Sequence, residues 1–135
     1  MENAPLTLDG LEPAVAHIAR TMLHAQLIPA PPQDECETWM CLPIVGEAAG
    51  ALWVGFPAGA GARIFQAMSG ELPTDSSESV EACGEFTNWV AGWVKTRFTE
   101  SSVGLPQVDE AAPADAQRYG FDGDFQVTVA VLVFG

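Results

Sequence analysis

The sequence predicts a single α+β domain in which long helices pack on a mostly antiparallel sheet. Apolar residues recur at helical spacing in two long segments, and two apolar runs joined by a short link predict a hairpin of paired strands. A third apolar run closes the chain. Helices stacked on hairpin-connected strands form an α+β layer architecture. The 135 residues match the length of one ordinary domain, so residues 1–135 are assigned to it.

The segment "LEPAVAHIARTMLHAQ" predicts the first helix, from about Glu12 to Gln26. Its apolar side chains fall on one helical stripe, formed by Leu11, Val15, Ile18 and Met22 with Leu23 beside it. The next segment, "LIPAPPQDE", contains three prolines, which leave little room for a hydrogen-bonded element. A loop is therefore expected over residues 28–36.

Two strands and a short helix are expected next. The runs from Thr38 to Val45 and from Gly50 to Phe56 are rich in Trp, Ile and Val, and "GEAAG" separates them, so a hairpin is the simplest topology. In "PAGAGARIFQAMSG" a turn precedes a short helix, and Gly70 is placed to cap its end.

The longest helix is predicted from about Ser76 to Thr99, with Asp75, Ser76 and Ser77 as candidates for its N-cap. The segment "VGLPQVDE" predicts one short edge strand, because Pro106 cannot donate to a strand ladder. An acidic, alanine-rich loop is expected to follow as far as Gly123. The final segment "DFQVTVAVLVFG" predicts a strand that enters the interior of the sheet.

Charge excludes several classes of partner. Five Lys and Arg residues against eighteen Asp and Glu give a formal net charge of -13, which would repel phosphate backbones and anionic lipid headgroups. Neither a nucleic acid nor a membrane is therefore expected as a partner. The first residues, "MENAPLTLDG", lack the features of a signal peptide, and no apolar run approaches about 20 residues. We expect a cytoplasmic protein.

The cysteines and histidines predict no metal site. Cys36, Cys41 and Cys83 form no CxxC spacing and have no nearby histidine, so reduced and packed thiols are expected. His17 and His24 lie seven residues apart without a carboxylate between them, as surface or packing residues often do.

One sector of the long helix is polar, and it contains the candidate catalytic residues Glu85 and Asn88. At about 100 degrees per residue, Glu78, Glu81, Gly92, Lys95, Thr96 and Thr99 fall in the same sector. The oxygen of an asparagine side chain accepts a hydrogen from water while its nitrogen donates to a phosphoryl oxygen, which suits the orientation of a water molecule for in-line attack. A solvated polar stripe is the alternative.

Glycines beside this sector bear on the choice. Glycine inside a helix costs about 0.5–1 kcal/mol relative to alanine, so Gly84 and Gly92 need a compensating reason. The reason is either close helix packing or access for another molecule to Glu85 and Asn88.

The segment "VEACGEFTNWVAGWVKTRF" resembles the signature helix of the CheX and CheC chemotaxis phosphatases, in which G-E-x-x-N precedes a glycine four residues after the asparagine. The preceding hairpin, "GFPAGAGARIFQAMSG", "GLPQV" and the last apolar strand also resemble the family order. The resemblance implies a CheC-like fold. It further implies a phosphatase that removes the phosphoryl group from the aspartyl phosphate of a CheY-type response-regulator receiver domain, in chemotaxis or two-component signalling.

By the same resemblance, Glu85 matches the glutamate that anchors a receiver lysine, and Asn88 matches the asparagine that orients the attacking water. The phosphatase then has no cofactor or metal of its own, since the magnesium ion belongs to the receiver. CheC-type members carry two E-x-x-N helices, whereas the first helix here has none, which favours a CheX-like protein and a homodimer formed through the sheet. Phe86, Thr87 and Trp89 are bulkier than the family pattern and could reshape the docking surface.

Two alternatives remain open. The same surface could dock a receiver or serve as an adaptor without catalysis. A nucleotide-using enzyme is suggested by "GFPAGAGAR", but Ile64 stands where the third glycine of G-x-G-x-x-G belongs and no G-K-[ST] follows, so a simple turn is favoured. The roles of Trp89, Trp93 and Lys95 around the motif are not defined by the sequence.

Overall fold

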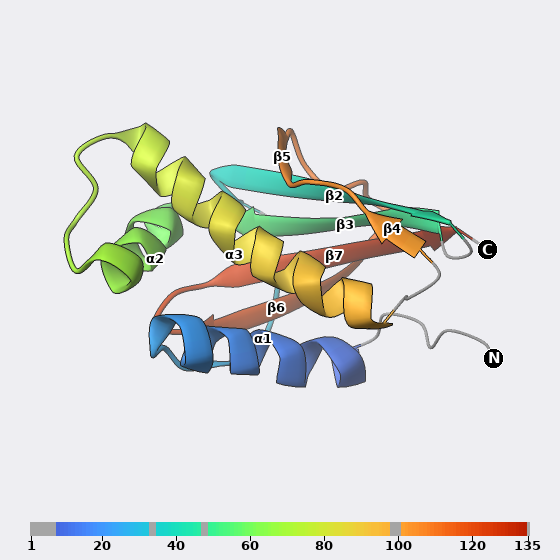
Figure 1. Cartoon of the computed structure of the whole chain (residues 1–135), viewed down its shortest axis with the longest axis horizontal. Helices are drawn as coiled ribbons and strands as arrows, with labels where there is room; N and C mark the ends of the chain where they lie inside the picture. The colour runs from blue at the N-terminus through green and yellow to red at the C-terminus, as the bar shows by residue number, and fades with distance from the viewer. Residues whose placement is uncertain (1–7, 33–34, 47–48, 98–100, 135) are drawn as a thin grey trace.

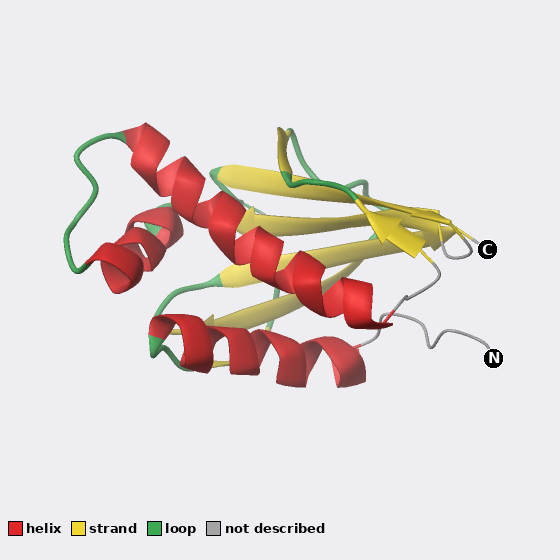
Figure 2. Ribbon diagram, in the orientation of Figure 1, coloured by secondary structure: helices red, strands yellow, loops and turns green. Residues whose placement is uncertain are grey.

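In the described part of the chain, seven strands form one antiparallel sheet, and three helices cover one of its two faces (Figure 1, Figure 2). The structure is a computed structural model that describes residues 8–32, 35–46, 49–97 and 101–134. The described chain contains α1 (Leu8–Leu23), β1 (Leu27–Ala30), β2 (Thr38–Gly46), β3 (Ala49–Phe56), α2 (Ala60–Ser69), α3 (Ser76–Arg97), β4 (Ser101–Val103), β5 (Gln107–Asp109), β6 (Gln117–Gly123) and β7 (Val127–Phe134). The predicted α+β class is confirmed.

The strands lie in the order β1-β6-β7-β3-β2-β4, and β5 pairs with β2 beside β4. The predicted hairpin is β2–β3, in which Leu42 faces Leu52, and each strand is one residue longer at the turn than expected. The C-terminal strand, β7, pairs with both β3 and β6. This interior position explains its continuous apolar sequence, because both of its faces are covered.

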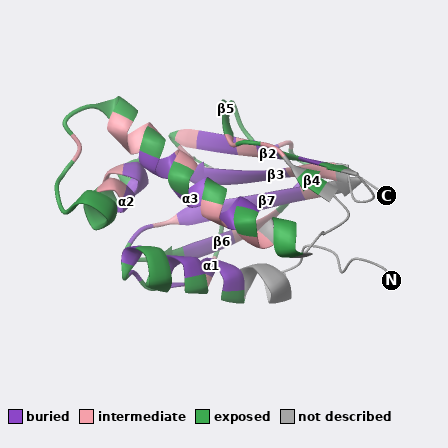
Figure 3. Cartoon of the chain, in the orientation of Figure 1, coloured by how far each residue is buried: buried purple, intermediate pink, exposed green. Residues whose placement is uncertain are grey.

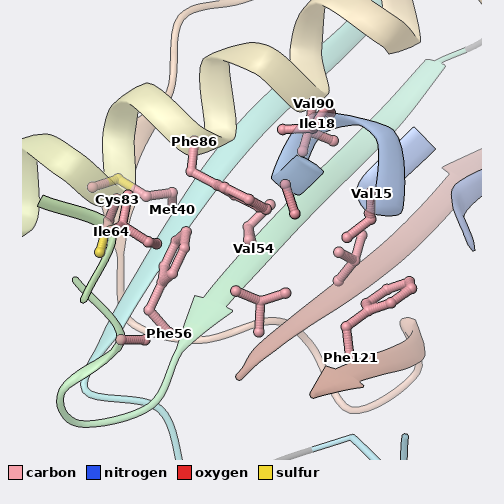
Figure 4. Close-up of a cluster of buried hydrophobic side chains, with 14 of the residues drawn as sticks. Val15, Ile18, Met40, Val54, Phe56, Ile64, Cys83, Phe86, Val90 and Phe121 are labelled. Atoms are coloured by element: carbon pink, nitrogen blue, oxygen red, sulfur yellow. The ribbon is translucent and has the colours of Figure 1, made fainter. Parts of the chain in front are cut away.

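The main core lies between the helices and the sheet (Figure 4). Alternate residues of β2, β3 and β7 point toward the helices, so Leu42, Val54 and Val129 are all fully buried there. They meet Val15 of α1 and Phe86 of α3, which are also fully buried. Each large apolar side chain of this kind stabilises the fold by about 1.5–3 kcal/mol. The core thus fixes the position of α3 above the sheet.

The prediction of a loop over residues 28–36 was wrong at its start, where the structure forms β1. β1 is an outer strand of the sheet and pairs with β6 on one side only. Pro29 has no N–H to donate. It is tolerated there because an edge strand forms ladder hydrogen bonds on one side only.

The prediction of a loop as far as Gly123 was also wrong, since Gln117–Gly123 forms β6. Tyr119 and Phe121 pack into the core from this strand, while Arg118 and Asp122 alternate with them. The single edge strand predicted within "VGLPQVDE" is instead two short strands, β4 and β5, and both pair with β2. Gly104 to Pro106 separate them.

Two helix boundaries differ from the prediction. α1 spans Leu8–Leu23 rather than residues 12–26, because His24 takes a left-handed backbone conformation with φ of 51°. Met22, expected on the buried stripe, is 46% exposed. α3 ends at Arg97, and the predicted end at Thr99 lies outside the described residues.

A smaller apolar cluster lies on the sheet face opposite the helices. It is formed by Trp39, Trp53, Ala112, Ala116 and Ala130. Arg118 holds the covering loop in place: its guanidinium donates hydrogen bonds to three backbone carbonyls of residues 112–116, at 2.8, 2.8 and 3.2 Å. The candidate site lies on the other side of the molecule, on the helices that cover the first face of the sheet.

Candidate functional site

The first turn of α3 is capped by its own sequence. The Glu78 backbone N–H donates to the Asp75 carboxylate at 3.2 Å, as an N-cap requires, and the Ser77 hydroxyl donates to it at 2.6 Å. Of the three N-cap candidates, Asp75 is thus the one used. The Glu78 carboxylate reaches back to the Thr74 backbone N–H at 2.8 Å. These hydrogen bonds fix where α3 begins and so which of its residues face outward.

The same contacts lower the pKa values of two carboxyl groups. The pKa of Asp75 lies below its usual value because the Ser77 hydroxyl and then the Glu78 backbone N–H donate to the ionised form. The pKa of Glu78 is also lowered, chiefly by the Thr74 hydroxyl and by the Thr74 backbone N–H. Both carboxylates are therefore stabilised in their charged form. The positive end of the helix dipole also favours these negative charges.

Glu85 and Asn88 are both exposed, one turn apart on the outer side of α3. Figure 3 shows this side of the helix, with exposed residues in green alternating with the buried residues that face the sheet. Among the described residues, neither side chain has a hydrogen-bond or ion-pair partner. The carboxylate and the carboxamide are therefore both available to another molecule.

The bulky residues of the motif do not cover this surface. Phe86 and Thr87 are fully buried, and the Thr87 hydroxyl donates to the Cys83 carbonyl at 2.8 Å. The Phe86 ring packs edge-on against Phe56, with ring centroids 5.8 Å apart, and against Trp89 at 6.3 Å. Trp89 is half-buried against the core. The departures from the family pattern thus add to the core.

The two helix glycines are not required by packing within the chain. A Cβ added at Gly92 would meet no atom within 4 Å, and one added at Gly84 would meet only the Met40 methyl, at 3.9 Å. Close helix packing therefore does not account for them. The glycines instead leave the surface beside Glu85 and Asn88 without projecting side chains, so that another molecule can reach it.

Glu85 and Asn88 line one hollow, with a volume of about 410 Å³, together with residues from two other parts of the chain. Phe65 and Met68 reach it from α2, and Leu105 and Pro106 reach it from the link between β4 and β5. These contributions could not be predicted from the sequence, because they depend on how α2 and the β4–β5 link lie beside α3. The sequence signal was an apolar residue next to Pro106 in a segment with little room for regular structure.

Lys95 and Trp93 can now be placed. Lys95 is exposed on α3, beyond Gly92 and on the same side as Asn88. Trp93 is half-buried and packs against the core. Neither lines the 410 Å³ hollow, so their positions add no group to its chemistry.

The cysteines and histidines lie apart from this hollow. Burial, and to a lesser extent the charge of Glu37, raises the pKa of the Cys83 thiol to about 12. Burial also raises the pKa of Cys41, and Asp109 adds to the shift. None of the three cysteines forms a disulfide, as expected. His17 and His24 are exposed, and within the described ranges no group of three or more metal-binding side chains occurs.

The glycine-rich segment before α2 forms a turn. Gly59 has a left-handed backbone, with φ of 89°, and the Ala60 N–H donates to the Pro57 carbonyl at 3.1 Å. The hollow beside it has a volume of only about 120 Å³ and includes Glu37. The turn interpretation is confirmed.

A larger hollow, of about 690 Å³, lies at the end of α1 and the start of β1. Its lining includes exposed Arg20 and His24 and the carboxylate of Asp124, which accepts the Gln26 backbone N–H at 2.8 Å. Neither Glu85 nor Asn88 lines it. Size alone would favour this hollow, but the paired carboxylate and carboxamide favour the smaller one.

Comparison with protein-family models gives no match, and comparison with curated proteins gives none either. No described helix is both long and apolar enough to cross a membrane.

Solved structures match over nearly the whole chain. The chemotaxis protein CheX from Vibrio vulnificus matches with a TM-score of 0.82 and 19% identity, over 99% of both chains. A CheC-like superfamily protein from Shewanella sp. PV-4 matches with a TM-score of 0.77 and 20% identity, over 96% of this chain and 100% of the other. A CheX–CheY–BeF3–Mg²⁺ complex from Borrelia burgdorferi matches with a TM-score of 0.72 and 14% identity, over 95% and 97%. The chain therefore has the fold of the CheX and CheC-like proteins.

Proposed function

We propose that this chain, which has the CheX-like fold, is a phosphatase that removes the phosphoryl group from the aspartyl phosphate of a CheY-type receiver domain. The observation that carries the proposal is the pair Glu85 and Asn88, exposed without intramolecular partners on one face of α3 and lining one hollow. One structural neighbour was solved as a complex of CheX with CheY, BeF3 and Mg²⁺, which supports a receiver as the partner.

Asn88 would act on the attacking water. Its carboxamide oxygen accepts a hydrogen from the water, and its nitrogen donates to a phosphoryl oxygen. The water oxygen then forms a bond to phosphorus in line with the bond to the receiver aspartate, which breaks. The aspartate leaves as a carboxylate, and both water hydrogens leave with inorganic phosphate. An amide carries no proton to exchange in this step, so Asn88 contributes by orientation.

Glu85 would hold the receiver in place. Its carboxylate lies one helical turn before Asn88 and is exposed, so it can pair with a lysine beside the aspartyl phosphate. In this proposal the magnesium ion belongs to the receiver, where it neutralises charge on the phosphoryl oxygens. The phosphatase acts in the cytoplasm together with its partner.

We also propose a homodimer formed through the sheet face opposite the helices. Val45 is 63% exposed on that face, and Ala51 and Leu132 are half-buried beside the smaller apolar cluster. Burying them against a second copy would leave α3 free. The mass measured by light scattering at micromolar concentration should be that of two chains, whereas the mass of one chain would contradict the dimer.

The phosphatase proposal is tested by following the loss of aspartyl phosphate from purified receiver domains of the source genome. The wild-type chain should accelerate the decay of at least one receiver, and Asn88→Ala should remove the acceleration. Glu110→Gln is the control, since Glu110 is exposed, does not line the hollow and has no proposed role. Binding to a receiver without acceleration by the wild type would replace the phosphatase with a docking or adaptor module.

A further inference from the structure

Two exposed apolar side chains line the same hollow as Glu85 and Asn88. Met68, in the last turn of α2, is 43% exposed, and Leu105, in the β4–β5 link, is 76% exposed. Neither belongs to the buried core. In this hollow they lie together with Glu81, Glu85 and Asn88, and an apolar surface rimmed by polar residues marks a site where another protein binds.

Both side chains are carried on backbone that cannot easily move. α2 lies so close to α3 that a Cβ at Gly61 would come within 2.8 Å of the Ser79 carbonyl oxygen. The Gly104 N–H donates to the Pro43 carbonyl at 2.9 Å, next to Leu105. The distance between the two apolar side chains is thus set by the fold, so a partner must fit both at once.

Charge restricts the partner further. Glu81 and Glu85 are exposed along the first half of α3, and Glu78 is half-buried before them. The whole chain carries a formal charge of -13. A partner that covers the hollow must therefore bring cationic side chains to this end of α3, because like charges would oppose the contact.

We propose that Met68 and Leu105 are the two anchors that select the receiver. The partner is a receiver domain with apolar side chains on both sides of its phosphorylated aspartate and basic residues opposite Glu81. This inference rests on the proposed function and deepens it. The anchors act through binding, whereas Asn88 acts on the chemical step, so the two roles affect different measured quantities.

The test measures binding and turnover separately. Affinity is determined with a receiver activated by beryllofluoride, which forms a stable mimic of the aspartyl phosphate, and turnover is the decay rate at saturating protein. Met68→Ser and Leu105→Ser are each expected to weaken binding about tenfold while leaving the saturated rate unchanged. Their melting temperatures should equal that of the wild type, since both side chains are exposed.

The controls match in residue type and exposure. Met22 on α1 is 46% exposed, and Ile28 on β1 is 57% exposed, both outside the hollow. Met22→Ser and Ile28→Ser should change the affinity by less than about twofold.

Unchanged affinity in both anchor variants would overturn the inference, as would a loss of saturated rate at constant affinity. So would a change in the self-association of the anchor variants without a change in receiver affinity, because the occupant would then be a second copy. A wild type that binds receivers without accelerating decay would remove the phosphatase proposal but leave the anchor test intact. Binding by none of the receivers would overturn both.

Discussion

Glu85 and Asn88 reach the surface because the two residues between them do not. Phe86 and Thr87 are fully buried, so the segment alternates between the outside of α3 and the core. The Phe86 ring also packs edge-on against Phe125, with ring centroids 5.9 Å apart. Burial of this ring orients the helix, and the helix in turn orients the carboxylate and the carboxamide. At this scale, apolar packing supplies the position and polar groups supply the chemistry.

Gly92 allows a direct test of whether a missing side chain keeps the surface next to Asn88 accessible. A Cβ at this position would meet no atom, so Gly92→Ala should raise the free energy of unfolding by about 0.5–1 kcal/mol through better helix propensity. Urea denaturation measures the gain. Gly92→Leu fills the space one turn after Asn88 and should weaken receiver binding without loss of stability. A loss of stability in Gly92→Ala would contradict the open-surface account.

At the scale of the element, α3 depends on its first turn. The pKa of Asp75 is lowered in the folded state, chiefly by the hydrogen bond from the Ser77 hydroxyl. A lowered folded-state pKa contributes stability above the unfolded pKa, and this contribution is lost as pH falls through the folded value.

The cap therefore predicts a pH-dependent effect of Asp75→Ala. The variant should be less stable than the wild type at pH 6, and the difference should shrink below about pH 4, where the carboxylate protonates. Unfolding by urea across this range measures it. Asp75→Asn is the control, since asparagine caps a helix without titrating there. A difference that grows on acidification would contradict the assignment of the cap.

Gly61 sets the contact between α2 and α3. Gly61→Ala places a methyl group 2.8 Å from the Ser79 carbonyl oxygen, which must move, and this should lower the free energy of unfolding by about 1–3 kcal/mol. Gly84→Ala is the matched glycine control, because its added carbon would lie 3.9 Å from the nearest atom. Equal stability of the two variants in urea would argue against close packing of the two helices.

The sequence predicted α2, α3 and the β2–β3 hairpin because each carries local signals of its own: apolar residues on one side of α2, N-cap candidates and a polar sector in α3, and runs rich in Trp, Ile and Val in the hairpin. β1 and β6 were not predicted. Pro29 and the polar residues of β6 lie at positions where tertiary pairing, rather than local pattern, determines the strand. Glu85 and Asn88 were placed correctly on one exposed face. Met68 and Leu105 were missed, because their approach to α3 is a property of the assembled layers.

In the whole molecule, the two faces of the sheet carry different features. The helices and the candidate site occupy one face, and the 112–116 loop held by Arg118 covers part of the other. The Trp53 indole N–H donates to the Asp109 carboxylate at 3.1 Å on that second face. Changes on the second face should therefore alter stability without altering activity.

Arg118→Met tests this separation. It removes the donors to three backbone carbonyls and should lower the free energy of unfolding by about 1–3 kcal/mol. Tryptophan fluorescence should report greater exposure of Trp39 and Trp53. Receiver affinity, measured at a temperature where the variant is folded, should stay at the wild-type value. A matching fall in affinity would mean that the two faces are coupled.

We propose that Asn88 orients the attacking water after the receiver has docked. It is tested most directly by measuring, for Asn88→Ala, both the decay rate of the aspartyl phosphate at saturating protein and the affinity for the beryllofluoride-activated receiver. We expect decay at the receiver's own unaided rate, with affinity within about threefold of the wild type. A saturated rate equal to that of the wild type would contradict it.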